Sequence, residues 1–336
     1  EKGIDAVLVA TPDHTHAVAS IAAIRHGKHV YCEKPLTKTV REAREVARAA
    51  REMKVATQMG NQGMAFEGNR QIKEWLAAGV MGPVREVHVW SDRPTRRGRL
   101  PGWWAQGIER PSDTPPVPDH LDWDLWLGPA PKVPYSPQRH YGFMGWHDYA
   151  RGGQLTNWGV HLMDIVHWGI QQDAPLNIQA IGGSYRHHPG ADNYETIEAI
   201  FEYPGCNVTW EQRHSNSHAG KGYGIRFNGT EGELFVDRGT FKVRPAGLGI
   251  EEFIGEPERS WANPDHHHNF FNSVRTRELP AADIEQGFRS TTSVLLAGIA
   301  LKTKRKLNWD RETETFIDDE AANRHLSRPY RSPWRL

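Results

Sequence analysis

Val30-Tyr31-Cys32-Glu33-Lys34-Pro35-Leu36 reads as the end of an apolar strand followed by a charged turn. A helix is expected soon after this turn. A second buried strand lies upstream at residues 4–10 and ends in the turn Thr11-Pro12. One short helix joins the two strands. The ends of parallel strands meet at one edge of a doubly wound sheet, where such folds bind their ligands. The sequence therefore predicts a ligand site around these two turns.

The neighbouring residues continue the alternation of strand and helix. We expect a helix over 15–27, closed by Gly27, and a strand over 29–32. Thr39-Val40-Arg41-Glu42 matches a capping box, which opens a helix that ends near Met53. A further strand is expected over 55–59. This β-α-β-α-β order predicts a parallel sheet with right-handed crossovers.

Beyond residue 65 the pattern becomes that of an antiparallel sheet. After a helix over 66–79 and a strand over 84–90, residues 94–140 are rich in Pro, Trp and Arg and predict an irregular surface excursion. Strand-like runs separated by turn signals follow at 176–186, 194–203, 206–214, 223–228, 232–236 and 240–244. Helices are expected over 265–276 and 282–303, and the polar tail from 305 is expected to wrap the surface.

Charge and cysteine content narrow the classes of partner. The chain has 336 residues, with 41 basic and 41 acidic side chains and a net charge of +0. We therefore expect neither nucleic acid nor a membrane as a partner, and no apolar run reaches the length of a membrane span. Cys32 and Cys206 are too few for a disulfide framework and lack metal-ligand spacing, so we expect both to be small core residues.

A second constellation is Gly152-Gly153-Gln154-Leu155-Thr156-Asn157-Trp158-Gly159-Val160-His161-Leu162-Met163-Asp164. Together with Glu33-Lys34-Pro35, it makes the chain resemble the Gfo/Idh/MocA oxidoreductases over nearly its whole length. The resemblance implies an α/β fold: the C-terminal half of a Rossmann-type domain at 1–64, then an α/β substrate and oligomerisation domain at 65–336 with a large, mostly antiparallel open sheet. It also implies NAD or NADP as cofactor, a sugar or polyol as substrate, and a homo-oligomer formed through the sheet.

The same resemblance implies two catalytic side chains. Lys34 would reach the nicotinamide region and the reacting hydroxyl, and its ammonium can donate to an oxygen on which charge develops. His161 occupies the position of the acid/base, for which its ordinary pKa is well suited. Asp164, one helical turn on, could fix the tautomer of His161 or hold a substrate hydroxyl. Asn157 stands where many relatives carry Asp, and an amide can orient the substrate or the imidazole but cannot stabilise an imidazolium by charge.

Each of these assignments has a structural alternative. Glu33-Lys34-Pro35 could be only a loop before a helix, and His161 could be a core histidine under Trp158 and Trp168. We expect Thr11, Pro12, His14, His16, Glu33, Asn61 and Gln62 to lie near the cofactor, with turn and helix capping as the alternative for the turn residues. Trp146 is expected near the substrate. We expect no metal at Asp265-His266-His267-His268, because consecutive helical residues point in different directions and no partner ligands stand at recognised spacing.

A dinucleotide fold needs G-x-G-x-x-G after its first strand, and none stands in that context here. We therefore expect this chain to be a fragment that lacks the first half of its nucleotide domain. The leading hypothesis is that the protein is an NAD(P)-dependent oxidoreductase that moves hydride to or from a hydroxyl carbon of a sugar or polyol. The alternatives are NAD-dependent glycoside cleavage by transient oxidation and elimination, and a non-catalytic carbohydrate-binding remnant.

Overall fold

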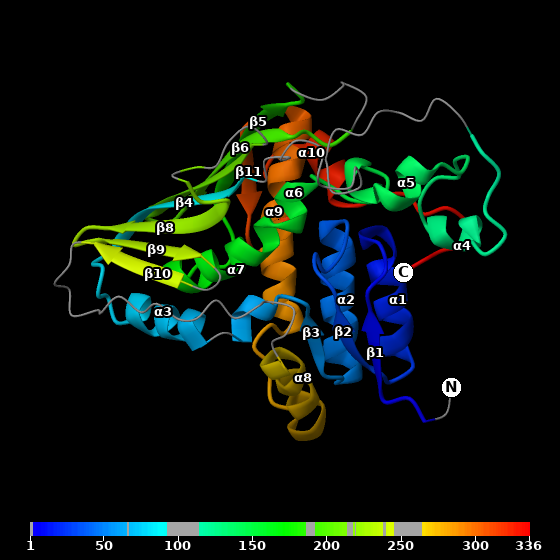
Figure 1. Ribbon diagram of the computed structural model, residues 1–336, viewed down its shortest axis with the longest axis horizontal. Coiled ribbons are helices and arrows are strands. Elements are labelled where there is room, and N and C mark those ends of the chain that lie inside the picture. Colours follow the sequence, from blue (N-terminus) through cyan, green and yellow to red (C-terminus); the bar gives the residue numbers. More distant parts are fainter. Residues whose placement is uncertain are drawn as a thin grey trace.

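The computed structural model describes residues 3–65, 67–92, 114–185, 192–213, 218, 220–237, 240–244 and 264–336. Two sheets with their helices lie side by side, and the long helix α9 (Ile284–Thr303) runs between them (Figure 1). On one side α9 contacts the smaller sheet and its helix α2 (Val40–Met53), and on the other it contacts the larger sheet. The α/β class predicted from the sequence is confirmed.

The smaller sheet is parallel, in the order β1-β2-β3, with β1 at Ala6–Val9, β2 at His29–Cys32 and β3 at Thr57–Met59. Helix α1 (Asp13–Arg25) connects β1 to β2, and α2 connects β2 to β3. The predicted capping box is present at α2, where Thr39 and Glu42 exchange side-chain-to-backbone hydrogen bonds of 3.2 and 2.9 Å. The strand–helix alternation read from the sequence is thus confirmed.

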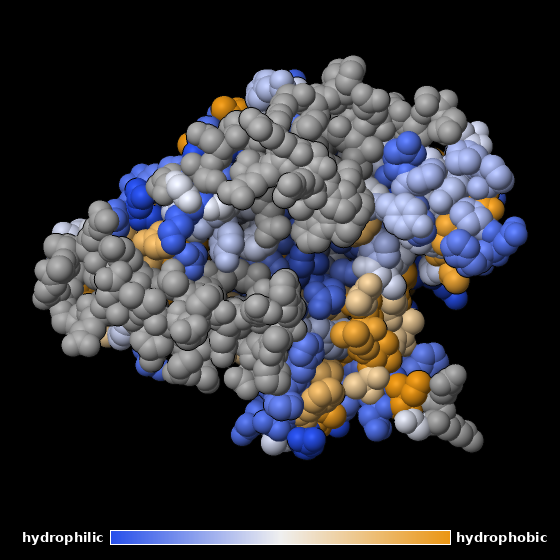
Figure 2. Space-filling model, viewed as in Figure 1, coloured by the Kyte–Doolittle hydropathy of each residue, from blue (hydrophilic) through white to orange (hydrophobic). Residues whose placement is uncertain are grey.

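The outer edge of β1 pairs with no other strand of the described chain. Leu8 on this strand is 63% exposed and Ile4 just before it is also exposed, and Figure 2 shows hydrophobic side chains gathered over this edge. An apolar strand with an open edge is a template for pairing with another strand.

The larger sheet has nine strands in the order β10-β9-β8-β4-β7-β6-β5-β11-β12. Strand β4 pairs parallel to β7, and every other pair in the sheet is antiparallel. The strands are β4 Val84–Asp92, β5 Asn177–Gly183, β6 Thr196–Tyr203, β7 Cys206–Arg213, β8 Tyr223–Gly229, β9 Glu233–Asp237, β10 Thr240–Arg244, β11 Leu307–Asp310 and β12 Thr315–Phe316.

Shorter elements connect and cover the sheets. They are η1 Gln62–Ala65, α3 Glu67–Ala77, α4 Trp123–Leu127, α5 Pro137–Tyr141, η3 Phe143–Gly145, α6 Gln154–Asn157, α7 Gly159–Ile170, α8 Pro264–Thr276, α10 Glu320–Asn323 and η5 Arg324–Leu326. Residues 93–113 of the expected excursion lie outside the described residues, and its remainder contains α4 and α5. No helix in the described ranges is both long and apolar enough to cross a bilayer.

The inner face of the large sheet packs on α7 and α9, and this face corrects one expectation. From the expected strands at 176–244 we predict an outward-facing apolar set of six residues: Ile178, Ile181, Tyr185, Ile197, Phe201 and Trp210. In the structure Ile178, Ile197, Phe201 and Trp210 are buried in the core. Successive residues of a strand point to opposite faces, so Ile178 and Ile181, three positions apart, cannot share one. Of our set only Ile181 and Tyr185 are exposed.

The C-terminal tail corrects a second expectation. Residues 307–316 do not wrap the surface but form β11 and β12, which extend the large sheet beyond β5. Farther on, Arg328 and Tyr330 donate to Glu42 of α2 at 2.8 and 2.6 Å. The tail therefore fastens to both sheets. Both cysteines are buried, as expected.

Candidate active site

Lys34 reaches from the turn after β2 to the helix pair that carries His161. Its Nζ donates to the backbone oxygen of Asn157 at 3.2 Å and also to the side-chain oxygen of that residue. The side-chain nitrogen of Asn157 donates in turn to Gln154 at 3.1 Å. Two residues predicted to act together, 123 positions apart in the sequence, are thus in contact.

Backbone geometry explains the glycines before Asn157. Gly152 and Gly153 have φ values of 86° and 56°, a left-handed region that residues with a Cβ rarely adopt. They turn the chain into α6, and Trp158 joins α6 to α7. His161 follows Asn157 by four residues and lies in the first turn of α7, with its ring centroid 5.9 Å from that of Trp158. Lys34, Asn157 and His161 therefore occupy the corner where the end of β2 meets the α6–α7 junction.

Asp164 lies deeper than we expected. It is fully buried and accepts hydrogen bonds from Asn61 at the end of β3 and from Gln286 of α9, the latter at 3.4 Å. Burial raises the pKa of Asp164 to about 7, although hydrogen bonds from Asn61, Ser290 and Gln286 oppose the shift. These contacts make Asp164 a link between the small sheet, α7 and α9. The contacts of Asp164 support a structural role and not the expected hydrogen bond to a substrate hydroxyl.

Asn61 also takes part in this link. Its side chain is buried, and its nitrogen donates to Asp164 and to the backbone oxygen of Val160, the latter at 3.2 Å. These hydrogen bonds fasten the end of β3 to α7, and contact between Asn61 and the cofactor stays a prediction. Gln62, the next residue, is half-buried and bonds to the hydroxyl of Tyr31.

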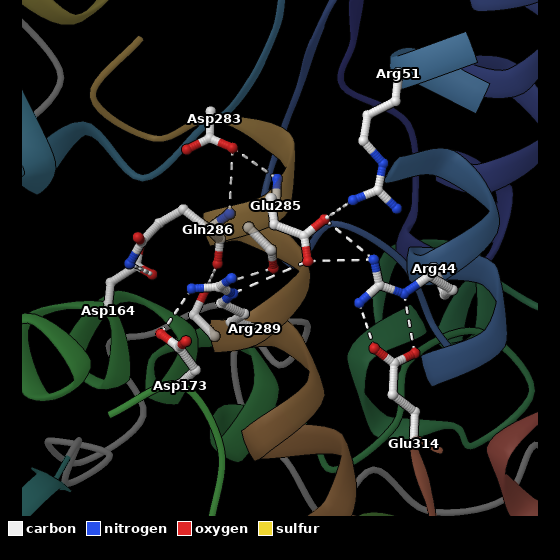
Figure 3. A network of polar contacts seen from close by, with 11 residues as sticks. Arg44, Arg51, Asp164, Asp173, Asp283, Glu285, Gln286, Arg289 and Glu314 are labelled. Carbon is white, nitrogen blue, oxygen red and sulfur yellow. Dashed lines mark hydrogen bonds and ion pairs between the residues drawn. The ribbon is translucent and has the colours of Figure 1, made fainter. Parts of the chain in front are cut away.

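A polar network on α9 surrounds this link (Figure 3). Glu285 accepts from Arg44 and Arg51 of α2 at 3.1 and 3.0 Å, and Arg44 also pairs with Glu314 before β12. Arg289 pairs with Asp173 at 2.7 Å. Figure 3 shows Gln286, on the neighbouring turn, directed toward Asp164. This network holds the small sheet against α9 and so fixes where Lys34 meets Asn157.

The residues of the first turn divide into exposed and buried ones. Thr11 is exposed and Pro12 half-buried at the start of α1, as a ligand-facing turn requires. His14 is fully buried, and its Nε2 donates to the backbone oxygen of Trp126 at 2.9 Å. Burial lowers the pKa of His14 to about 3. His14 is therefore a neutral core residue that holds α4, and the expectation of cofactor contact is corrected. His16 is also buried, with both ring nitrogens facing backbone oxygens.

Glu33 and Trp146 complete the expected set. The half-buried carboxylate of Glu33 lies against Gly60, where an added Cβ would stand 2.6 Å from Oε2 and would displace the carboxylate. Trp146 is buried in a second small core, donates to Gln138 at 3.3 Å, and carries the Arg139 guanidinium 4.4 Å over its ring. The expectation that Trp146 contacts substrate is therefore corrected.

Of the three histidines at the start of α8, His266 is buried and packs on the small sheet, whereas His267 and His268 are exposed. Nδ1 of His266 accepts from Gln58 at 2.7 Å and lies 3.2 Å from the hydroxyl of Tyr31, so α8 is fastened to β2 and β3. Across the part of the chain that the structure describes, no three His, Cys, Asp or Glu side chains are grouped so that they could hold a metal.

Three residues of this region were not singled out from the sequence. Asp13 is buried in the first turn of α1, near His16, Lys34 and Lys38, and burial raises the pKa of its carboxyl. Gln154 supports Asn157, and Gln286 supports Asp164. Asp13 had a signal, since an acidic residue directly after a strand-end Thr-Pro turn lies at the ligand edge. The two glutamines had none, because only the tertiary contact gives them a role.

Comparisons with known proteins agree with this arrangement. Residues 70–336 match the model of the oxidoreductase family C-terminal alpha/beta domain GFO_IDH_MocA_C2, and residues 1–61 match that of the GFO_IDH_MocA NAD-binding Rossmann fold. The chain is 34% identical over 168 residues to 1,5-anhydro-D-fructose reductase of Ensifer adhaerens, covering 47% of this chain and 48% of the relative. It is 29% identical over 238 residues to 2,7-anhydro-N-acetylneuraminate hydratase of Escherichia coli K12, covering 70% of this chain and 52% of the relative.

Among solved structures, an inositol dehydrogenase homolog from Azotobacter vinelandii, complexed with NADH and myo-inositol, superposes with a TM-score of 0.64 at 17% identity, covering 91% of this chain and 78% of that one. At that identity the likeness concerns the fold alone. The chain spans about half the length of the two curated relatives above. Because the C-terminal domain match alone covers most of the sequence, the chain belongs to the Gfo/Idh/MocA oxidoreductase family.

Proposed function

We propose that the protein transfers hydride between a nicotinamide cofactor, NAD or NADP, and a hydroxyl-bearing carbon of a sugar or polyol. The observation that carries the proposal is the contact between Lys34 and Asn157, which brings the charged turn of the nucleotide half to the helix junction that presents His161. The match of residues 1–61 to an NAD-binding Rossmann model supports the cofactor class. The names of the two curated relatives, both acting on anhydro-sugars, support the substrate class.

The side chains at the strand ends fit the nicotinamide end of such a cofactor. Thr11 is exposed after β1, and Glu33 and Lys34 are partly exposed after β2, so polar groups are available at this edge. When bound, the nicotinamide ring supplies the hydride acceptor or donor. The G-x-G-x-x-G turn that would hold the pyrophosphate is not in this sequence, so the proposal concerns the reacting end of the site.

Each side chain then has one task. The Lys34 ammonium donates to the reacting oxygen and stabilises the negative charge that develops on it. His161 accepts the hydroxyl proton during oxidation and returns it during reduction. Asn157 holds the ammonium of Lys34 in place with two oxygen acceptors, and Asp164 fixes α7 through Asn61 and Gln286.

A redox-neutral reaction is the second candidate, and one observation favours it. The relative that aligns with 70% of this chain is named a hydratase, and hydration neither makes nor consumes reducing equivalents. Lys34 and His161 could serve the same way in a transient oxidation to a carbonyl, which acidifies the C–H of the adjacent carbon. Loss of that proton then eliminates a group from the carbon β to the carbonyl. In that case the hydride returns to the substrate at the end of each turnover.

The test follows reduced nicotinamide and sugar products together, in the chain and in any longer product that contains it. The proposal expects net nicotinamide reduction with a sugar or polyol, whereas sugar conversion without net reduction favours the redox-neutral reaction. Lys34→Ala and His161→Ala should each lower turnover at least 100-fold with little change in cofactor affinity. His88→Gln, on the outer face of the large sheet, is the control. Sugar binding that is indifferent to cofactor, with no turnover, would favour the carbohydrate-binding reading and overturn the proposal.

A further inference from the structure

His16 joins the two turns that form the ligand edge of the small sheet. Its Nδ1 lies 2.8 Å from the backbone oxygen of Pro35, and its Nε2 lies 2.7 Å from the backbone oxygen of Thr11. The side chain is 1% exposed, so no solvent competes for either nitrogen. Pro35 directly follows Lys34, and Thr11 lies in the turn after Val9, the last residue of β1, so one imidazole ring joins the turns that follow the two strands.

The chemistry of these two contacts constrains the charge of the ring. A neutral imidazole has one N–H donor and one nitrogen lone pair, and a backbone carbonyl oxygen can only accept. In either neutral tautomer, one ring nitrogen would direct its lone pair at an oxygen less than 3 Å away. Only the imidazolium donates to both oxygens, and an unmade buried hydrogen bond is costly.

The groups around His16 agree with a positive charge. Asp13 on its own helix and Cys32 on β2 face the ring, and the neighbouring turn brings Lys34 and Lys38 near Asp13. Burial lowers the pKa of His16, but Cys32, Asp13 and the Pro35 carbonyl raise it by more than burial lowers it. The net value is about 10. His14 lies close by and is neutral, so it adds no charge.

We propose that His16 is a positioning residue, held as an imidazolium between Thr11 and Pro35, which fixes the turn that aims Lys34 at Asn157. The positive charge of His16 is inferred from the hydrogen-bond geometry of its ring. The importance of His16 for catalysis rests on the function proposed above for Lys34. His14, two residues earlier, provides a contrast within the same helix. His14 has one carbonyl partner and is neutral. At physiological pH we therefore expect a neutral His14 and a positively charged His16.

Nitrogen NMR of the chain with 15N-labelled histidine tests the charge directly. We expect the His16 ring to carry protons on both nitrogens from pH 6 to 9, and the His14 ring to carry one over the same range. The variants His16→Gln and His14→Gln assign the two sets of signals by their loss. A His16 ring that is neutral at pH 7.5, or that titrates below pH 8, overturns the proposal.

The positioning role has its own readout, which does not depend on turnover. Glutamine can donate to one carbonyl but turns an oxygen toward the other, so His16→Gln should release the Lys34 turn. We expect the rate at which acetic anhydride modifies Lys34 to change at least fivefold, while that of the exposed Lys132 stays constant. We also expect kcat to fall at least tenfold with a smaller change in KM.

The outcomes separate the two proposals. An unchanged Lys34 modification rate in a folded His16→Gln variant overturns the positioning role. If that variant does not fold, the NMR of the unmodified protein still decides the charge. A charged His16 together with full turnover in Lys34→Ala would refute the proposed function of Lys34 and leave the imidazolium in place.

Discussion

The ammonium of Lys34 donates to both oxygens of Asn157, the backbone one at 3.2 Å, although Lys34 follows a strand of the small sheet and Asn157 ends helix α6. The sequence suggested that Asn157 would act on His161. The structure instead directs the amide oxygen to Lys34 and the amide nitrogen to Gln154. Asn157 therefore meets the ammonium of Lys34 with a dipole and not with a charge.

Asn157→Asp should accordingly change the behaviour of Lys34 first. A carboxylate in contact with an ammonium favours its charged form, so the alkaline limb of the pH–rate profile should move up by about one unit. The acidic limb should stay where it is, and His161→Ala should remove it. A displacement of the acidic limb alone would show that Asn157 acts on His161, as the sequence had suggested.

Asp164→Asn should make stability less dependent on pH. The folded-state pKa of Asp164 is raised from 3.8 to about 7, so its contribution is fully present below pH 4 and is lost as the pH rises through 7. The Asn variant cannot ionise and should keep its stability above pH 7. We expect a relative gain on the order of a few kcal/mol at pH 8, measured by urea unfolding from pH 4 to 8. Parallel curves for the two proteins would mean that Asp164 does not titrate in this range.

Arg44 and Arg48 offer a matched pair on one helix. Arg44 pairs with Glu285 and Glu314 and lies 3.7 Å over the ring of Phe288, whereas the partners of Arg48 among the described residues are Glu45 and Glu52 of its own helix. Arg44→Ala should cost about 2–3 kcal/mol of unfolding free energy, because it leaves Glu285 and Glu314 without this partner and removes packing. Arg48→Ala should cost less than about 0.5 kcal/mol. Equal losses would mean that the network adds nothing across the two sheets.

The outer face of the large sheet should form the subunit contact of a homo-oligomer. Ile181 on β5 and Ile200 on β6 are 63% and 53% exposed, and Tyr185 lies just beyond β5. Gathered apolar side chains on a sheet face indicate an interaction surface. Ile200→Glu should reduce the oligomer to a monomer in size-exclusion chromatography with light scattering. Leu279→Glu, in the loop after α8, should not, and a monomeric wild type at micromolar concentration would contradict the expectation.

Local signals predicted the parts of the fold that depend on short stretches. The capping box at Thr39, the strand-end turn at Lys34 and the glycine pair before Asn157 were all legible from the sequence, because each depends on residues a few positions apart. The fold class followed from the change of periodicity after residue 65.

Contacts between residues far apart in the chain determine the positions that could not be predicted from the sequence. In the sequence His14 resembles an active-site residue, but in the fold its Nε2 is hydrogen-bonded to the backbone oxygen of Trp126, 112 positions away. Trp146 is drawn into a small aromatic core that no periodicity reveals. The strand Leu307–Asp310 has too few residues for alternation to distinguish it from a polar tail, and its pairing with β5 and β12 is visible only in the folded chain.

Lys38 yields a prediction of increased stability. It is 6% exposed; its backbone N–H donates to Glu42 at 3.2 Å, but among the described residues no carboxylate pairs with its ammonium. Burial lowers the pKa of Lys38, Arg328 and Arg151 also lower it, and Glu42 and Asp148 raise it, with a net value of about 7. The unfolded chain binds this proton up to about pH 10.5, so wild-type stability should rise between pH 7 and 10 as the cost of charging Lys38 disappears.

Lys38→Met keeps most of the volume and removes the charge, so it should stabilise the fold at pH 7 by about 1–3 kcal/mol. The advantage should shrink toward pH 10, where the folded wild type holds the lysine neutral. Lys132→Met, at an exposed position, should stay within about 0.5 kcal/mol of wild type at both pH values. Urea unfolding at pH 7 and pH 10 measures all three proteins. If Lys38→Met is destabilising at both values, the ammonium contributes to the fold, and the charge balance around Glu42 and Arg328 favours a protonated Lys38.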